Sequence, residues 1–342
     1  MTVAEKKEPV FYGETSPPGG EEETPKEPVF YGGQAVMEGV MMRGTKGYAM
    51  AVRKANGEIA MVEKPLSTIT KRYPFLKWPL IRGVTALCSS MAVGFTALSQ
   101  SADIAFEGIE EEEPTSRFEQ WLFDKLGDKL NGIIKGFAMV FAIIIALGLF
   151  MLLPTFLGGL VPVSPAFTGV AEGLLRIVIF VGYVFLISRS NDIQRVFQYH
   201  GAEHKAINCF EQKLPLTTEN VAASNRLHKR CGTSFMLVVM VITMILFMIV
   251  RVDGIWLRFA SRILLLPLIA GISYEISVKW AGRRNNFLVR AIIFPGMLMQ
   301  RMTTKEPDNA QIEIAVAALE RVLEQEKDLG ALPQSPQGDK SP

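Results

Sequence analysis

Long runs of apolar residues with few charges occupy the middle of the chain. The four strongest runs cover roughly residues 136–160, 171–188, 234–251 and 258–276. A helix rises about 1.5 Å per residue, so about 20 apolar residues match a hydrocarbon layer of about 30 Å. These runs predict four membrane-spanning helices. The predicted fold class is therefore mainly α: a polytopic membrane helix bundle with about four spans.

The segment 77–105 is a weaker candidate for a span. It is moderately apolar and rich in small residues, and Ser89, Ser90, Ser99 and Ser101 interrupt it. This mixture is also typical of a helix that lies along the membrane interface. The sequence favours an interfacial or half-buried helix here, and it leaves a fifth span or a re-entrant segment open.

An alternation of apolar and polar residues near the N-terminus predicts a small β element. Two strand-like segments, 48–53 and 58–63, flank the dipeptide Asn56-Gly57. This dipeptide favours a type I′ turn, so we expect a β-hairpin. The preceding segment 33–44 sets three glycines among apolar residues. Such a segment predicts tight turns, or a neighbour that approaches the backbone closely.

These patterns divide the chain into five predicted regions. Residues 1–29 and 330–342 are poor in apolar residues and are expected to be disordered tails. Residues 30–130 form a cytoplasmic region with the hairpin and the interfacial helix, and residues 131–302 form the transmembrane bundle. Residues 303–329 have apolar side chains at helical spacing, which predicts an amphipathic cytoplasmic helix.

The positions of lysine and arginine orient the bundle. The connection 189–233 is rich in both, whereas the connection 161–170 has neither. Cytoplasmic loops carry an excess of basic residues, so the connection 189–233 and both termini are predicted to be cytoplasmic. Arg251 and Arg258, beside the third connection, run against this pattern but are outnumbered. The predicted location is the cell (plasma) membrane, which the chain crosses several times.

Charge, cysteine content and the N-terminal sequence exclude several classes of protein. The chain has 36 Lys and Arg against 34 Asp and Glu, a net charge of +2, and no long basic stripe, which argues against nucleic-acid binding. Its three cysteines are too scattered for a disulfide framework. The N-terminus lacks the apolar core of a signal peptide. The expected partners are the lipid bilayer and other membrane proteins, and the oligomeric state stays open.

The candidate chemistry lies in the basic connection 189–233, which holds all three histidines. His200 and His204 enclose Glu203 in an H-x-x-E-H string. Helix positions four apart share a face, so both imidazoles can reach one ion. In the inverted zinc-protease motif two such histidines bind Zn²⁺ and the glutamate is the general base. The sequence predicts Zn²⁺, or another divalent transition metal, at His200 and His204, with Glu203 as the catalytic residue.

Three further residues are candidate metal ligands. His228 and Cys231 would complete a closed site, which is typical of structural zinc. Glu275 lies far downstream, near the predicted cytoplasmic end of the last span, and proteases with the inverted motif also take a ligand from a distant glutamate. The alternatives remain open: the histidines can simply bind backbone carbonyls, and Glu275 can pair with Arg283 or Arg284.

Several blocks of sequence resemble one known family. The blocks are Gly32–Gly44, Tyr199–Lys205, Arg230–Phe235 and Leu265–Arg283. They resemble the YqhQ family over roughly residues 30–302. The resemblance implies a bacterial inner-membrane protein with a domain of unknown function. The label of metal-dependent enzyme sometimes given to that family rests on the same histidine motif, and the resemblance implies no established substrate or reaction.

Two functions compete at this stage. The first is a metal-dependent hydrolase at the cytoplasmic face of the membrane. The second is a non-enzymatic membrane scaffold or assembly factor, in which the His/Cys site is structural. A transporter or channel is disfavoured, because Arg176, Arg262 and Glu275 are the charged residues expected to be buried and they offer little to line a polar path.

Overall fold

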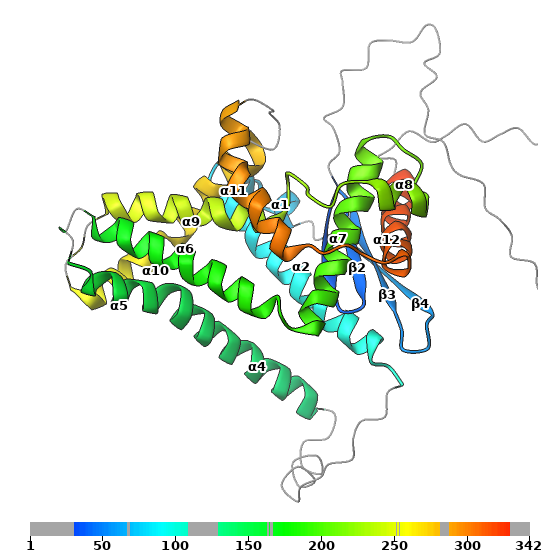
Figure 1. Ribbon diagram of the computed structural model, residues 1–342, viewed down its shortest axis with the longest axis horizontal. Coiled ribbons are helices and arrows are strands. Elements are labelled where there is room, and N and C mark those ends of the chain that lie inside the picture. Colours follow the sequence, from blue (N-terminus) through cyan, green and yellow to red (C-terminus); the bar gives the residue numbers. More distant parts are fainter. Residues whose placement is uncertain are drawn as a thin grey trace, which may run out of the picture.

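The computed structural model of the protein describes residues 31–66, 69–108, 129–162, 164, 167–250, 252, 254–280 and 287–328. The two predicted tails lie outside these ranges, as do Arg283 and Arg284, the predicted partners of Glu275. The described chain is mainly helical and carries one antiparallel sheet near its N-terminus (Figure 1).

The sheet has four strands in the order β1-β2-β3-β4. They are β1 (Gly32–Val36), β2 (Gly39–Arg43), β3 (Gly47–Arg53) and β4 (Ile59–Pro65). The predicted hairpin is present as β3 and β4, which pair from Gly47 with Pro65 to Arg53 with Ile59. The glycine-rich segment before it supplies β1 and β2, so the β element is twice as large as the hairpin alone.

The turn between β3 and β4 differs from the predicted type I′ turn. A type I′ turn needs positive φ at both central residues. Here Gly57 has φ +87°, whereas Asn56 is not among the residues with positive φ. The Gly57 N–H donates to the Lys54 carbonyl, so Gly57 is the fourth residue of the turn. The glycine is still required, one position later than the prediction placed it.

Helices cover both faces of the sheet, and β3 shows why. Ala49 and Ala51 of β3 pack in a core with α12 (Asn309–Asp328) and α7 (Asn191–Glu211). Met50 and Val52 point to the opposite face, where the C-terminal half of α2 (Ile81–Ala105) covers them. Because side chains alternate along a strand, a strand between two layers is buried throughout. The amphipathic helix predicted within residues 303–329 is present as α12.

The C-terminal helix also holds the sheet through Glu326, whose carboxylate is buried. It accepts hydrogen bonds from the N–H groups of Thr45 and Lys46, at 2.5 and 2.8 Å, and from the Thr45 hydroxyl at 2.6 Å. These donors lie in the turn between β2 and β3. One side chain from the end of the chain therefore closes a turn near its beginning.

Replacing Glu326 by alanine leaves these donors without a partner. We expect the docking of α12 on the sheet to weaken by about 3 kcal/mol, the scale of hydrogen bonds to a charged acceptor. Hydrogen exchange of the Thr45 and Lys46 amides in the detergent-solubilised protein measures this loss. The matched control is Glu324→Ala, because Glu324 is exposed and pairs with Arg321 on the same helix. Equal exchange in the two variants would contradict the prediction.

The second part of the molecule is a bundle of apolar helices, which lies to the left in Figure 1. Its elements are α4 (Lys129–Leu147), a π-helical turn (Gly148–Leu152), α5 (Leu153–Leu160), α6 (Thr168–Ile187), α9 (Gly232–Ile249), α10 (Ile255–Tyr274), a second π-helical turn (Glu275–Trp280) and α11 (Phe287–Thr303). Short elements complete the described chain: α1 (Ile69–Arg72), a 3-10 turn (Pro74–Lys77) and α8 (Thr218–Ala223).

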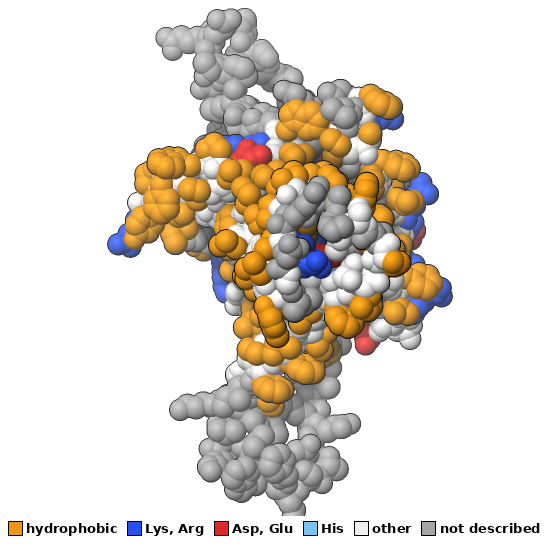
Figure 2. Space-filling view, turned by 90° about the vertical axis from the view of Figure 1, so that its left-hand side faces the viewer, with side chains coloured by type: hydrophobic (Ala, Val, Ile, Leu, Met, Phe, Trp, Pro, Cys, Tyr) orange, Lys and Arg blue, Asp and Glu red, His pale blue; other side chains and the backbone are white. Residues whose placement is uncertain are grey.

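Five helical segments of the described chain are long and apolar enough to cross a membrane. They are Ile81–Ala105, Gly136–Leu160, Thr168–Ile187, Gly232–Ile249 and Trp256–Trp280. Many large apolar side chains on the bundle point outward, and side chains of this kind dominate the end of the molecule seen in Figure 2. Outward apolar surface on long helices indicates a membrane protein.

Helix α2, the segment that the sequence treats as a weak span, contacts both parts of the molecule. Near its N-terminus, Gly83 lies against Gly271 and Tyr274 at the C-terminal end of α10. Near its C-terminus, Ala97 and Ala105 are buried against the sheet. Both ends of α2 therefore meet elements on the sheet side of the bundle.

Candidate metal centre

Helix α7 carries the H-x-x-E-H string and packs against the sheet beside α12 (Figure 1). Its residues Tyr199, Ala202 and Ala206 pack into the core shared with the sheet and α12. With that face fixed, the helical spacing turns His200 and His204 towards the segment that precedes α9. The two imidazoles are neighbours there, with ring centroids 4.4 Å apart.

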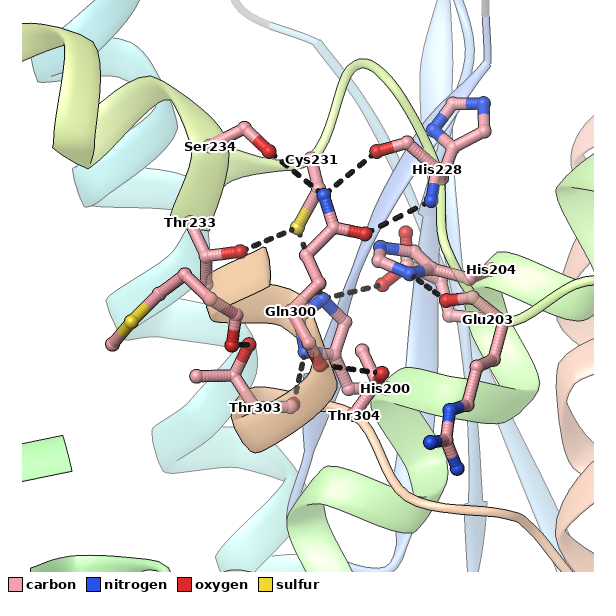
Figure 3. Close-up of polar contacts among 12 residues, drawn as sticks. His200, Glu203, His204, His228, Cys231, Thr233, Ser234, Gln300, Thr303 and Thr304 are labelled. Carbon is pink, nitrogen blue, oxygen red and sulfur yellow. Dashed lines mark hydrogen bonds and ion pairs between the residues drawn. The ribbon is translucent and has the colours of Figure 1, made fainter. Parts of the chain in front are cut away.

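Cys231 joins the two histidines from the residue immediately before α9. The side chains of His200, His204 and Cys231 offer ligand atoms that all lie within 4.8 Å of one another. The Cys231 sulfur is 3.3 Å from His200 Nε2 (Figure 3). Of the residues that the sequence predicts as ligands, the structure brings these three together in one group that could hold a metal ion.

Backbone carbonyls orient both imidazoles of this group. His200 Nδ1 is 2.8 Å from the Thr303 carbonyl oxygen, and His204 Nδ1 is 2.6 Å from that of Arg226. A carbonyl can only accept, so each Nδ1 carries a proton, and in the neutral ring Nε2 is then the nitrogen with the lone pair. Metal-bound histidines in proteins are held in the same way by their second nitrogen. Both rings thus present the nitrogen that binds metals.

Burial also favours the neutral form of two of the histidines. It lowers the pKa of His204, and likewise that of His228. Both shifts favour the uncharged ring at neutral pH. This is the state that binds metal ions, because a protonated nitrogen has no lone pair to donate.

Glu203 lies beside the group but on the sheet side of α7. Its carboxylate is buried and reaches to 4.0 Å from His200 Nε2. The N–H of Gly33 in β1 hydrogen-bonds to it, and a Cβ on Gly33 would touch the Glu203 side chain. This is the close approach that the glycine-rich segment predicts. Burial raises the pKa of Glu203, the nearby His200 and His228 opposing the shift.

His228 lies next to the group without joining it. Its ring centroid is 5.8 Å from that of His204, and its Nε2 is 3.5 Å from a Glu211 carboxylate oxygen. The side-chain amide of Gln300 clasps its backbone, accepting from the His228 N–H at 2.9 Å and donating to the His228 carbonyl at 2.8 Å. The same amide donates to the Ser234 hydroxyl at 2.8 Å. Gln300 thus fixes the segment that carries Cys231.

Glu275 lies apart from the histidines. Its carboxylate forms two hydrogen bonds with the Arg82 guanidinium, at 2.7 and 2.5 Å, and accepts a third from the Leu80 N–H at 3.4 Å. Arg82 therefore fixes the Glu275 carboxylate against the start of α2. The predicted pairing with Arg283 or Arg284 concerns residues outside the described ranges.

The connection between α11 and α12 crosses α7 at the histidines, and Gly201 makes room for it. The Lys305 N–H donates to the Phe197 carbonyl at 2.9 Å. A Cβ on Gly201 would overlap the Lys305 carbonyl oxygen. Because residue 201 has no side chain, the connection can lie directly on the helix. This contact places the Thr303 carbonyl against His200.

The sequence reasoning missed the groups that orient the predicted ligands. Gln300 is fully buried, and the only signal for it was an amide within the apolar segment 287–302. The carbonyls of Thr303 and Arg226 carry no side-chain signal at all. The carboxylate of Glu38, between β1 and β2, likewise pairs with Arg195 and accepts from the Tyr199 hydroxyl at 3.2 Å, both on α7.

Comparisons with known proteins agree with the resemblance seen in the sequence. A family model described as "Protein of unknown function (DUF1385)" matches residues 78–325, which include the whole metal-ligand group. The "Uncharacterized protein YqhQ" of Bacillus subtilis (strain 168) is 36% identical over 296 residues, which cover 85% of this chain and 92% of the relative. No solved structure matches the chain. The chain therefore belongs to the DUF1385 family, together with its Bacillus relative YqhQ.

Proposed function

We propose that the protein binds a divalent transition metal, Zn²⁺ by preference, and uses it to hydrolyse a substrate at the membrane surface. The observation that carries the proposal is the arrangement of His200 and His204 beside Cys231. Both rings are anchored at Nδ1 by backbone carbonyls, and both Nε2 atoms belong to one ligand group with the cysteine sulfur. The anchored rings direct both Nε2 atoms into this group, as the second nitrogen does in metal-bound histidines, and this supports a metal ion there.

The ligand chemistry favours zinc and leaves room for catalysis. Two imidazole nitrogens and one thiolate are a common donor set for Zn²⁺. Three protein ligands leave the fourth position of a tetrahedral ion for water, as in catalytic sites. Glu203, whose carboxylate is 4.0 Å from His200 Nε2, would be the general base for such a water. A metal ion lowers the pKa of bound water and so supplies the nucleophile.

We infer that four segments cross the membrane: α4 with α5, then α6, α9 and α10. Helix α2 would lie at the interface, because both of its ends meet elements on the sheet side. An even number of crossings puts both termini on one face, and the basic connection 189–233 marks this face as cytoplasmic. The ligand Cys231 immediately precedes α9, so the metal centre would lie at the inner surface of the plasma membrane.

A structural role for the same ion is the second candidate. His200 and His204 belong to α7, which packs on the sheet, whereas Cys231 opens α9 of the bundle. A metal held by all three would tie the sheet to the bundle. His228 could then supply a fourth ligand and close the site, as in structural zinc centres. In that case the protein would be a membrane scaffold or assembly factor.

The substitution Glu203→Gln separates the two roles. We expect the variant to keep its metal and to lose at least about a hundredfold in hydrolysis, because it removes the general base. Bound metal is measured by elemental analysis of the purified protein. Hydrolysis is measured on nitrophenyl esters, nitrophenyl phosphate and fluorescent casein. Glu219→Gln, an exposed glutamate on α8, is the matched control.

The outcomes are distinct for the two candidates. Hydrolysis that depends on metal in the wild type and in Glu219→Gln, and that is lost in Glu203→Gln, supports the enzyme. A metal-loaded wild type that hydrolyses none of these probes favours the structural role. Undiminished hydrolysis in Glu203→Gln would rule out Glu203 as the base.

A further inference from the structure

A second group of buried charges lies at the far end of the bundle from the metal centre. It consists of Glu172 and Arg176 on α6 and Arg262 on α10, with exposed fractions of 0%, 7% and 4%. Burial of the two arginines is expected from the sequence, whereas that of Glu172 was not predicted. Both arginines contact the ring of Phe247 on α9. Phe247 lies fifteen residues after Gly232, roughly 22 Å along α9 from the end that adjoins the metal centre.

The group is ordered by contacts on several sides. Arg262 Nη2 donates to a Glu172 carboxylate oxygen at 3.0 Å. The guanidinium carbons of Arg262 and Arg176 lie 3.7 and 5.2 Å from the centroid of the Phe247 ring. The Phe247 ring therefore contacts both cations.

A proline supplies a further partner for Arg176. In a regular helix the N–H of residue 154 would donate to the carbonyl of residue 150. Pro154 has no N–H, so this bond to the Phe150 carbonyl cannot form. Arg176 Nε donates to this carbonyl at 2.8 Å. The π-helical turn before Pro154 is thus part of the arginine site.

Several buried polar atoms of the group still have no hydrogen-bond partner. They are Thr155 Oγ1, Glu172 Oε1, Arg176 Nη1, Arg262 Nε and Arg262 Nη1. Three of the five are guanidinium nitrogens, which can only donate. Within the described chain, the group is therefore short of acceptors.

The charges are also unbalanced. Among the described residues of the group, Arg176 and Arg262 bring two positive charges against the single negative charge of Glu172. Arg258, one turn earlier on α10, adds a third cation with Nη1 3.9 Å from Glu172. Breaking a buried pair costs several kcal/mol because it leaves an uncompensated charge. A net positive group at membrane depth is a functional candidate by default.

We propose that this group is a binding site for an oxyanion of the phosphate type. A phosphate or phosphodiester brings the missing negative charge and several acceptor oxygens, which guanidinium groups bind at short range. Arg262 lies seven residues into α10, about 10 Å from the start of that helix. A lipid headgroup and a free phosphate share this chemistry, and the experiment distinguishes them.

The test uses the full chain, freed of lipid in a maltoside detergent that contains no phosphate. Its melting temperature is followed while phosphatidylglycerol, inorganic phosphate or diacylglycerol is added. We expect a saturable rise with a phosphate-bearing additive and none with diacylglycerol. A rise with phosphatidylglycerol alone assigns the site to a lipid headgroup, and a rise with both assigns it to oxyanions in general. No rise with either would overturn the proposal.

Two substitutions should shift binding in opposite directions. Arg262→Gln removes donors and a charge, so we expect binding at least about tenfold weaker. Glu172→Gln removes the competing carboxylate with little change in shape, so we expect tighter binding than in the wild type. Arg189→Gln, an exposed arginine at the other end of α6, is the control with the same loss of charge.

The Glu172→Gln variant keeps the proposal testable if Arg262→Gln fails to fold. A purely structural ion pair predicts that Glu172→Gln melts lower and gains no affinity for phosphate, and this result would overturn the proposal. Elemental analysis of the same samples keeps the two sites apart, because the metal content should not depend on Arg262 or Glu172.

Discussion

Asparagine in place of His204 is expected to strip the metal ion from the protein. The substitution removes the Nε2 lone pair at the centre of the ligand group and also the ring that binds the Arg226 carbonyl. Loss of a supporting residue alone weakens metal sites by 10–100-fold, so loss of a ligand should exceed about a hundredfold. Elemental analysis after gel filtration should find about one equivalent of zinc in the wild type and none in the variant.

The matched control is His228→Asn. His228 is also buried and lies next to His204, but its side chain is outside the group of three ligand atoms. We expect this variant to keep its metal, and a chelator to remove metal from both it and the wild type. Loss of metal in His228→Asn would instead assign His228 as a fourth ligand and favour a closed, structural site. A wild type without any bound transition metal would refute the metal proposal itself.

Alanine in place of Gly201 is expected to damage the same centre without touching a ligand. The added methyl group would overlap the Lys305 carbonyl oxygen, a backbone atom that cannot rotate away. The connection between α11 and α12 must then lift off α7, taking the Thr303 carbonyl from His200 Nδ1. We expect a metal affinity at least about tenfold weaker, and a loss of stability of about 1–3 kcal/mol from overpacking.

The control for this substitution is Gly232→Ala. Gly232 follows the ligand Cys231 directly, and a Cβ there would have nothing within 4 Å. This variant should bind metal as the wild type does. Zinc affinity is measured by competition with a chromophoric chelator, and stability by hydrogen exchange of α7. Equal affinity in the two glycine variants would show that the connection does not position His200.

Most elements of the fold could be predicted from the sequence, because each depends on the local spacing of its apolar residues. Continuous apolar runs marked α6, α9 and α10, and helical spacing marked α12. The sequence did not predict which elements pack against one another. The apolar stripe of α12 says that it is buried, but nothing local says that it lies on the sheet. Helix α2 was ambiguous because one end packs on α10 and the other on the sheet.

The candidate site was predictable where chemistry is local and unpredictable where it depends on folding. His200, Glu203 and His204 are brought together by helical spacing alone, so the motif suggested them. Cys231 was one of three proposed further ligands. Only the folded structure shows that Cys231 lies beside His200 and that Glu275 does not. The Arg82 side chain that binds Glu275 belongs to a helix almost two hundred residues earlier, beyond any local pattern.

The burial of β3 on both faces has a consequence for how the chain is made. Strands β1 to β4 leave the ribosome first, yet one face of their sheet is covered by α12, which emerges after every helix of the bundle. Contacts between such distant segments form slowly and leave apolar surface unprotected in the meantime. One face of the sheet therefore stays exposed until the bundle has been inserted and α12 has been made. A nascent chain arrested before residue 309 would hold all the proposed ligands but not the helix that completes the support of α7.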